Sequence, residues 1–167
     1  MKDWLGCRER HLGPANVIKS MCDDDLQYVF YRAGRKGAKT TTGIDVCWRK
    51  AIKQPNSVIY FCYPTIAQGI EVVWEERRLQ TCDRKDDYMF DRYIEKVDDS
   101  RHILKFNNGS FVKLIGTWTE ARGRGTQPDL LVYDEVQDAN PDYIEAMAGW
   151  NCTPCTLPRR TAQAKRF

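Results

Sequence analysis

The chain has 167 residues and a formal net charge of +3, with 42% hydrophobic and 29% charged side chains. This length fits one domain with a buried core, and the composition excludes a disordered or fibrous protein. The small net charge is compatible with a nucleic-acid partner but is no argument for one, because compact nucleic-acid binders are usually more basic.

Seven cysteines are scattered along the chain, which does not indicate the dense disulfide framework of a small secreted domain. No apolar run approaches the ~18 residues that cross a bilayer, and residues 1–6 lack the apolar core of a signal peptide. The sequence therefore predicts a protein of a reducing, cytoplasmic compartment with no membrane contact.

The first half of the chain predicts strands and helices in alternation. A short run of β-forming residues at 26–31 predicts a buried strand, followed by a glycine-bearing turn and a helix over 40–50. A second apolar strand is expected at 57–63. A capping-box pattern at 65–68 then opens a helix that reaches about residue 79.

In the second half, the strongly charged residues 83–99 predict a helix with a solvated face. Two β-rich runs, 103–106 and 111–115, flank Asn-Asn-Gly-Ser and predict a β-hairpin. An apolar strand is expected at 129–133 after a polar loop. Asn140 and Pro141 then start a short helix as its cap and first position.

This alternation predicts an α/β fold, with a mostly parallel sheet covered by helices on both faces and the hairpin as a local antiparallel addition. We expect an N-terminal extension at 1–25 and a core at 26–148. Residues 149–167 lose periodicity and are expected to form a loosely structured tail that ends a fragment.

The turn after the first predicted strand has the residues of a phosphate-binding site. Glycines 34 and 37 allow consecutive backbone N–H groups to face an anion, and the following helix adds its dipole. Lys39 is expected to reach the β- and γ-phosphates of a nucleoside triphosphate, and the Thr40 hydroxyl to bind Mg²⁺. The predicted nucleotide contacts are Gly34, Arg35, Lys36, Gly37, Ala38, Lys39, Thr40 and Thr41.

The usual pattern for such a turn, G-x-x-x-x-G-K-[ST], requires glycine at positions 33 and 38, and both are alanine here. A basic turn between strand and helix that binds no ligand therefore stays open as the alternative.

Asp134 and Glu135 follow the predicted strand at 129–133, at the end where α/β sheets bind ligands. Asp134 is expected to hold Mg²⁺, and Glu135 to orient or deprotonate the attacking water. The alternative is an exposed acidic loop, since Asp138 and Asp142 continue the acidity.

These residues resemble the ATPase domain of the large terminase subunit, the DNA-packaging motor of tailed bacteriophages. The family has a deviant phosphate loop with an arginine near its start, which corresponds to Arg35 here. The similarity extends over residues 26–147, in four stretches: the phosphate loop, Val58 to Thr65 ending in Tyr-Pro-Thr, the hairpin at 106–110, and the Arg-Gly loop at 121–125 that leads into the Asp-Glu strand.

The resemblance implies a P-loop NTPase of the additional-strand type, in which one more strand lies between the phosphate-loop strand and the acidic strand. It also implies ATP hydrolysis with Lys39 and Arg35 on the γ-phosphate, Thr40 and Asp134 on Mg²⁺, and Glu135 on the water. The partners implied are double-stranded DNA, the portal protein, the small terminase subunit and further copies in a ring, in the cytoplasm of an infected host cell. A C-terminal nuclease is also implied, and this chain has no segment expected to supply it.

Arg122 and Arg124, in the glycine-flanked loop, are expected to stabilise transition-state charge in cis or on a neighbouring subunit, or to contact DNA phosphates. A solvated basic loop is the alternative. The coupling motif of the family has its nearest counterpart in Cys152-Thr153-Pro154, and an adenine-reading glutamine in Gln27.

Cysteine and tryptophan residues outside these motifs are expected to have structural roles. The pairs Cys152/Cys155 and Cys7/His11 could form a zinc site, but they lie at opposite ends of the chain and free thiols are the default. Trp74 is expected in the core, whereas Trp118 lies in a loop.

Two rival functions share the same motifs. A helicase-like DNA translocase would need a second motor domain. A non-catalytic P-loop module that binds only nucleotide or a partner is favoured by the two alanines and by the missing coupling strand.

Overall fold

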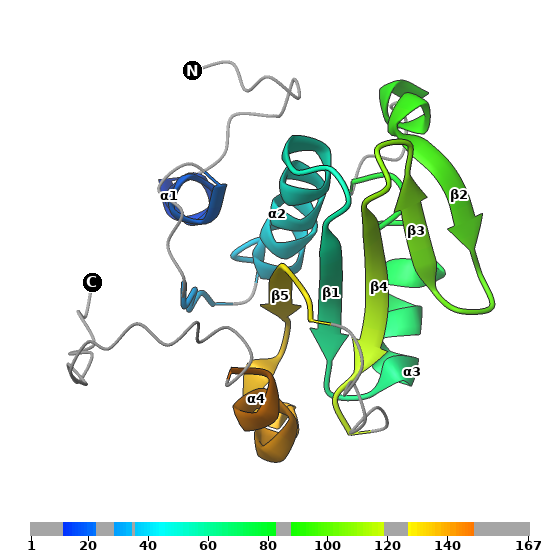
Figure 1. The fold of residues 1–167 in the computed structure, drawn as a ribbon. Coiled ribbons are helices and arrows are strands. Elements are labelled where there is room, and N and C mark those ends of the chain that lie inside the picture. The colour runs from blue at the N-terminus through cyan, green and yellow to red at the C-terminus, as the bar shows by residue number, and fades with distance from the viewer. Residues whose placement is uncertain (1–11, 23–28, 35, 83–87, 119–126, 149–167) are drawn as a thin grey trace, which may run out of the picture.

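The computed structural model describes residues 12–22, 29–34, 36–82, 88–118 and 127–148. At its centre is a five-stranded sheet with strand order β2-β3-β4-β1-β5 (Figure 1). The strands are β1 (Val58–Tyr63), β2 (Ile94–Asp98), β3 (Ile103–Phe106), β4 (Phe111–Gly116) and β5 (Leu130–Tyr133).

The sheet is mixed. Strands β4, β1 and β5 are parallel neighbours, whereas β3 is antiparallel to both β2 and β4. The predicted hairpin is confirmed, with Gly109 at its turn in a positive-φ conformation of 83°. It is not a local addition, however, because β4 pairs in parallel with β1 inside the sheet. The α/β class is thus confirmed, with a sheet that is only partly parallel.

Helices flank this sheet (Figure 1). They are α1 (Leu12–Cys22), α2 (Lys39–Lys53), α3 (Ile66–Gly69), a π-helical turn η1 (Ile70–Trp74), the 3₁₀ turns η2 (Tyr88–Tyr93) and η3 (Val136–Asp138), and α4 (Pro141–Ala148). No described helix has the length and apolarity needed to cross a membrane.

The two faces of the sheet have separate cores. Alternate residues of β1 point to opposite faces, so Phe61 packs with Trp48 of α2 and Leu114, whereas Cys62 packs with Tyr143 of α4. Helix α1 lies in the predicted N-terminal extension, and its Ile18 joins the core on the α2 side. The helices thus bury both faces of the three parallel strands.

Gly43 brings α2 directly onto the sheet. A Cβ atom at this position would lie 3.0 Å from Val132 Cγ1 and 3.2 Å from Phe61 Cε2, tighter than most real contacts. Because glycine lacks that atom, the first turn of α2 can lie close to the carboxyl ends of β1 and β5. This approach sets the position of the site.

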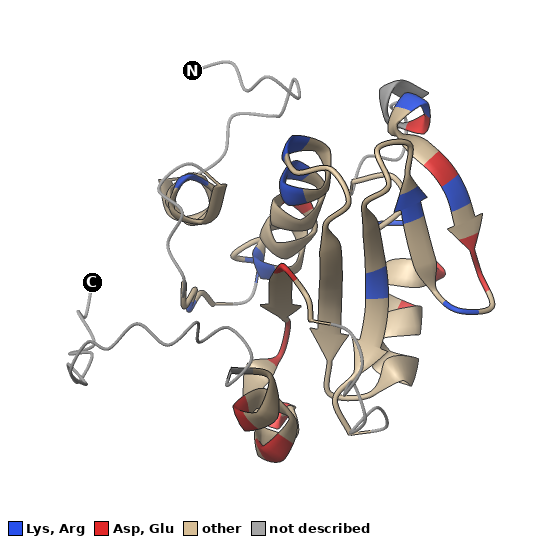
Figure 2. Cartoon of the chain, in the orientation of Figure 1, with Lys and Arg blue, Asp and Glu red and all other residues tan. Residues whose placement is uncertain are grey.

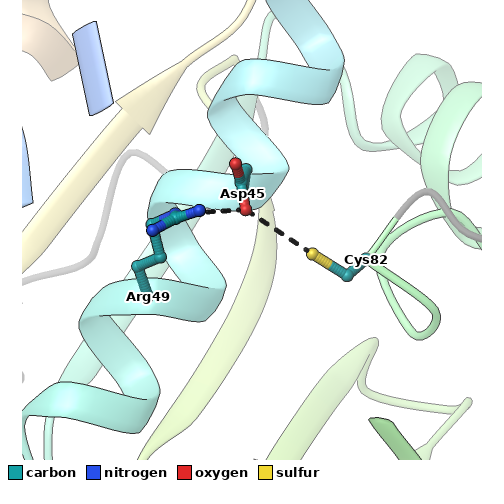
Figure 3. Close-up of polar contacts among 3 residues, drawn as sticks. All are labelled: Asp45, Arg49 and Cys82. Atoms are coloured by element: carbon teal, nitrogen blue, oxygen red, sulfur yellow. Dashed lines mark hydrogen bonds and ion pairs between the residues drawn. The ribbon is translucent and has the colours of Figure 1, made fainter. Parts of the chain in front are cut away.

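A buried polar cluster joins α2 to the turn that follows η1 (Figure 3). Asp45 and Arg49 form an ion pair at 3.3 Å within α2, and Cys82 Sγ donates to Asp45 Oδ1 at 3.9 Å. Nearby, Trp48 Nε1 donates to the Leu79 carbonyl at 2.7 Å. These contacts fix residues 79–82 against the helix.

Three predicted elements differ from the structure. Residues 29–34 form no strand (26–28 lie outside the described residues), because no described strand lies beside them to pair with. The prediction of a helix over 83–99 is wrong for its last residues, because Ile94 and Val97 belong to strand β2 and pair with β3. The helix that opens at Thr65 has the predicted capping box but ends at Trp74, where Arg77 N bonds back to the Trp74 carbonyl in a turn.

Candidate nucleotide and metal site

The predicted phosphate-binding turn is a tight structure in which the backbone reverses before α2. Gly37 N donates to the Gly34 carbonyl at 3.1 Å. Lys36 and Ala38 both adopt positive φ, at 64° and 54°. A Cβ atom at Gly37 would lie 2.5 Å from Ala33 Cβ, so this turn requires glycine at position 37. Ala38, which departs from the usual pattern, adopts the left-handed conformation despite its side chain.

Two side-chain hydroxyls hold this turn in place. Tyr31 Oη donates to the Gly37 carbonyl at 2.8 Å, and Thr42 Oγ1 donates to the Ala38 carbonyl at 2.7 Å. Both carbonyls are therefore directed towards protein donors. Hydrogen bonds from a residue before the turn and from a residue after it therefore stabilise the conformation that places Lys39 at the start of α2.

The start of α2 is a positively polarised helix end. Ala38 provides no side-chain cap, and the first turn contains no acidic residue. The first N–H groups of a helix have no partner within it, and the helix dipole adds partial positive charge there. Lys39 contributes a full charge, and its Nζ donates to the Ala33 carbonyl at 3.3 Å. This arrangement favours an anion.

Asp134 lies directly beside that helix start. Its Oδ2 accepts hydrogen bonds from Thr40 Oγ1 at 2.6 Å and from Tyr63 Oη at 2.8 Å. Its Oδ1 accepts from the Glu135 backbone N at 3.1 Å. Asp134 is 7% exposed, so a nearly buried carboxylate is held by three donors.

Glu135 is exposed at the mouth of the site and adopts a positive φ of 53°. Its Oε2 accepts a hydrogen bond from Gln137 Nε2, which also donates to Asp138 Oδ2 at 3.2 Å. The side chain is therefore held by a neighbour at the end of β5, next to the open space of the site.

That open space is a cleft of about 570 Å³. Residues 29–33 line it together with residues 131–137 from β5 and the segment after it. Lys39 and Asp134 are polar parts of its lining, and Val46 and Phe61 are apolar parts. The predicted lysine and the predicted acidic pair thus share one cleft.

The oxygen donors here suit Mg²⁺. It prefers oxygen ligands and commonly binds through one or two carboxylates with substrate phosphates, instead of through an all-protein cage. The hydroxyl of Thr40 and the carboxylate of Asp134 provide oxygens 2.6 Å apart. Within the described ranges, no group of three or more His, Cys, Asp or Glu side chains could hold a metal alone. Phosphate oxygens would have to complete the coordination.

Two residues that the sequence did not single out belong to this site. Tyr63 ends β1 and is 3% exposed. Its burial, and then the charge of Asp134, raise its pKa well above the ordinary value, so it stays a hydroxyl donor. Arg78 Nη2 donates to Thr41 Oγ1 at 3.5 Å, which brings another cation to the first turn of α2. Tyr63 directly precedes Pro-Thr in the stretch that carries the resemblance; no sequence signal marked Arg78.

Several predicted residues lie outside the described residues: Arg35, Arg122, Arg124, Gln27, Cys7, His11, Thr153 and both cysteines at 152 and 155. Trp74 is buried as expected, and its Nε1 donates to Asp99 Oδ1 at 3.0 Å. Trp118 is exposed, and its Nε1 donates to the Asp138 carbonyl at 2.9 Å.

Compared with models of protein families, with curated proteins and with solved structures, the chain shows no match.

Proposed function

We propose that this chain binds ATP with Mg²⁺ in the cleft beside the start of α2 and the end of β5 and hydrolyses it. The observation that carries the proposal is the hydrogen bond from Thr40 Oγ1 to Asp134 Oδ2 at 2.6 Å. It joins a polarised helix start carrying Lys39 to the acidic end of a parallel strand. The phosphates of a triphosphate bind at a positively polarised helix start, and its magnesium ion binds to a carboxylate.

The proposed roles follow from chemistry and position. Lys39 and the N–H groups of the first turn of α2 would bind the β- and γ-phosphates, with Arg35 beside them by resemblance. Thr40 and Asp134 would hold Mg²⁺, which supplies charge neutralisation when bound. Glu135 would accept a proton from, or orient, the attacking water, because it is exposed at the cleft and adjacent to Asp134.

The proposal includes the P-loop fold type with an additional strand. Support comes from the edge of the sheet: among the described residues β5 has a neighbour on one side only, β1. The cleft lies along it, lined by residues 29–33 across from residues 131–137. A further strand on that open edge would pair with β5 and cover the apolar part of the lining, and the nucleotide would bind beyond the end of that strand, beside Lys39 and Asp134.

On the resemblance, we extend the proposal to the motor of a terminase large subunit, which moves double-stranded DNA into a procapsid together with a portal protein and a small subunit. Charge restricts where DNA would bind. Acidic side chains gather at the end of β5 and on α4, whereas exposed Lys96 and Lys105 form a cross-strand pair on β2 and β3 (Figure 2). DNA would therefore avoid the α4 side.

One observation favours the rival, a module that binds nucleotide without turnover. The Glu135 carboxylate already accepts a hydrogen bond from Gln137. If that contact persists with nucleotide bound, Glu135 could not act as the base for the attacking water.

ATP turnover and nucleotide binding, measured separately, test the proposal. Lys39→Ala should abolish binding, and Glu135→Gln should keep binding but lower turnover by about 10²-fold or more. Lys19→Ala, at an exposed lysine of α1, is the matched control and should change neither. Wild-type binding without turnover, with or without DNA, would favour the rival. Absence of ATP binding would refute both.

A further inference from the structure

The Asp134 carboxylate has a buried partner that the proposed roles do not use. Tyr63 Oη donates to the same oxygen, Oδ2, that accepts from Thr40. The two hydroxyls approach from different elements, Tyr63 from the last position of β1 and Thr40 from the first turn of α2. The Glu135 N–H donates to the other oxygen, Oδ1. The three hydrogen bonds together fix the orientation of the Asp134 carboxylate.

The Tyr63 ring is itself held firmly. Its centroid lies 5.8 Å from that of Phe61, and a Cβ atom at Gly69 would lie 3.1 Å from Tyr63 Cδ2. The ring therefore packs against Phe61 and the end of α3, with little room to turn. The backbone of β5 is tied to the same strand, because Asp134 N donates to the Cys62 carbonyl at 3.0 Å.

We propose that Tyr63 is a positioning residue of the magnesium site, whose buried hydroxyl holds Asp134 in the orientation that the metal–nucleotide complex requires. The inference rests on the proposed function and adds a residue to it. A carboxylate fixed before binding loses less conformational freedom when the metal arrives, so the hydroxyl contributes to metal affinity. Tyr63 would touch neither nucleotide nor metal; it acts through Asp134.

The test separates metal-dependent from metal-independent nucleotide binding. Binding of a fluorescent ATP analogue is titrated across Mg²⁺ concentrations and, separately, in EDTA. Tyr63→Phe removes only the hydroxyl and keeps the packed ring. It should raise the Mg²⁺ concentration for half-maximal stimulation of binding about tenfold, the size expected for one hydrogen bond to a charged group. Affinity in EDTA should stay as in the wild type.

Tyr60→Phe is the matched control. Tyr60 is another buried tyrosine of β1, but it belongs to the core on the α4 side of the sheet. This variant should behave as the wild type. Asp134→Asn is the reference for loss of the carboxylate and should remove the Mg²⁺ stimulation.

The outcomes of the Mg²⁺ titration distinguish the positioning role of Tyr63 from a general packing effect. The inference is supported if Tyr63→Phe raises the Mg²⁺ concentration for half-maximal stimulation about tenfold and Tyr60→Phe leaves it unchanged. A wild-type Mg²⁺ dependence in Tyr63→Phe, while Asp134→Asn loses it, overturns the positioning role and leaves the proposed function intact. Equal loss of affinity with Mg²⁺ and in EDTA also overturns it, because that is a general packing effect. If the wild type itself shows no Mg²⁺ stimulation, the proposed function fails and the inference with it.

Discussion

Thr40 Oγ1 lies 2.6 Å from Asp134 Oδ2, so one hydrogen bond joins residues that are 94 positions apart in the chain. The contact exists because Gly43 lets α2 lie close to Val132 of β5. It fixes the distance between the helix start and the acidic end of the strand, and with it the shape of the site.

This hydrogen bond should be visible as coupling between the two residues. Thr40→Val keeps the side-chain shape but removes the donor, and we expect it to lower the free energy of unfolding by about 1–2 kcal/mol. A double-mutant cycle with Asp134→Asn, measured by denaturant unfolding, should give a coupling energy of at least about 0.5 kcal/mol. Strict additivity of the two substitutions would mean that the contact contributes nothing in solution.

The turn before α2 gives a second prediction. In Gly37→Ala the new Cβ would meet Ala33 Cβ at 2.5 Å, whereas nothing lies within 4 Å of a Cβ at Gly34. Gly37→Ala should therefore destabilise the fold by about 1–3 kcal/mol, and Gly34→Ala by much less. Thermal or denaturant unfolding of the pair measures this. Equal costs would contradict the turn geometry.

Much of this site could be predicted because its signals are local. Lys39 and Thr40 follow glycines, and Asp134 follows an apolar strand, so each half has its own pattern. The close packing of α2 on β5, where Gly43 lies against Val132, then places both halves at one edge of the sheet. The capping box at Thr65 and the hairpin at Asn107–Ser110 are local in the same way, and both are confirmed.

The rest depended on contacts between distant residues. Charged residues dominate 83–99, yet Ile94 and Val97 form strand β2 because β3 offers an edge to pair with. Residues 29–31 are rich in β-formers, yet form no strand, since no described strand lies beside them. Tyr63 reads as an ordinary strand residue, and only the fold shows that its hydroxyl reaches Asp134.

Arg78 provides a prediction about affinity. Its guanidinium lies at the first turn of α2, beside Thr41, where a cation is unfavourable unless an anion is bound nearby. Arg78→Gln should therefore weaken ATP binding about three- to tenfold, through loss of one charge near the phosphates. Arg77→Gln is the control, because Arg77 is exposed and adjacent. Equal affinity of the two variants, in an equilibrium binding titration, would exclude Arg78 from the site.

The buried ion pair in α2 makes a stability prediction. Arg49→Met removes one partner of the contact at 3.3 Å and leaves the fully buried Asp45 carboxylate with less compensation. Removing one member of a buried pair typically costs about 3–5 kcal/mol. Lys50→Met, one residue along the helix and more exposed, should change stability by less than about 0.5 kcal/mol. Similar unfolding midpoints for the two variants would contradict the role of the pair.

Cys47 gives the chain a pH dependence of known sign. Burial first, and then the neighbouring Cys62, raise the pKa of this thiol well above its ordinary value. Below about pH 8 the folded and unfolded states both keep the proton, so its stabilising contribution is fully present there. Above about pH 8.5 only the unfolded state releases it, and stability should fall by up to ~1.4 kcal/mol per pH unit for this one group. Denaturant unfolding between pH 7 and 10 should therefore show a shallower decline in Cys47→Ala than in the wild type. Parallel curves for the two proteins would mean that the thiol ionises as readily in the folded core as in the unfolded chain.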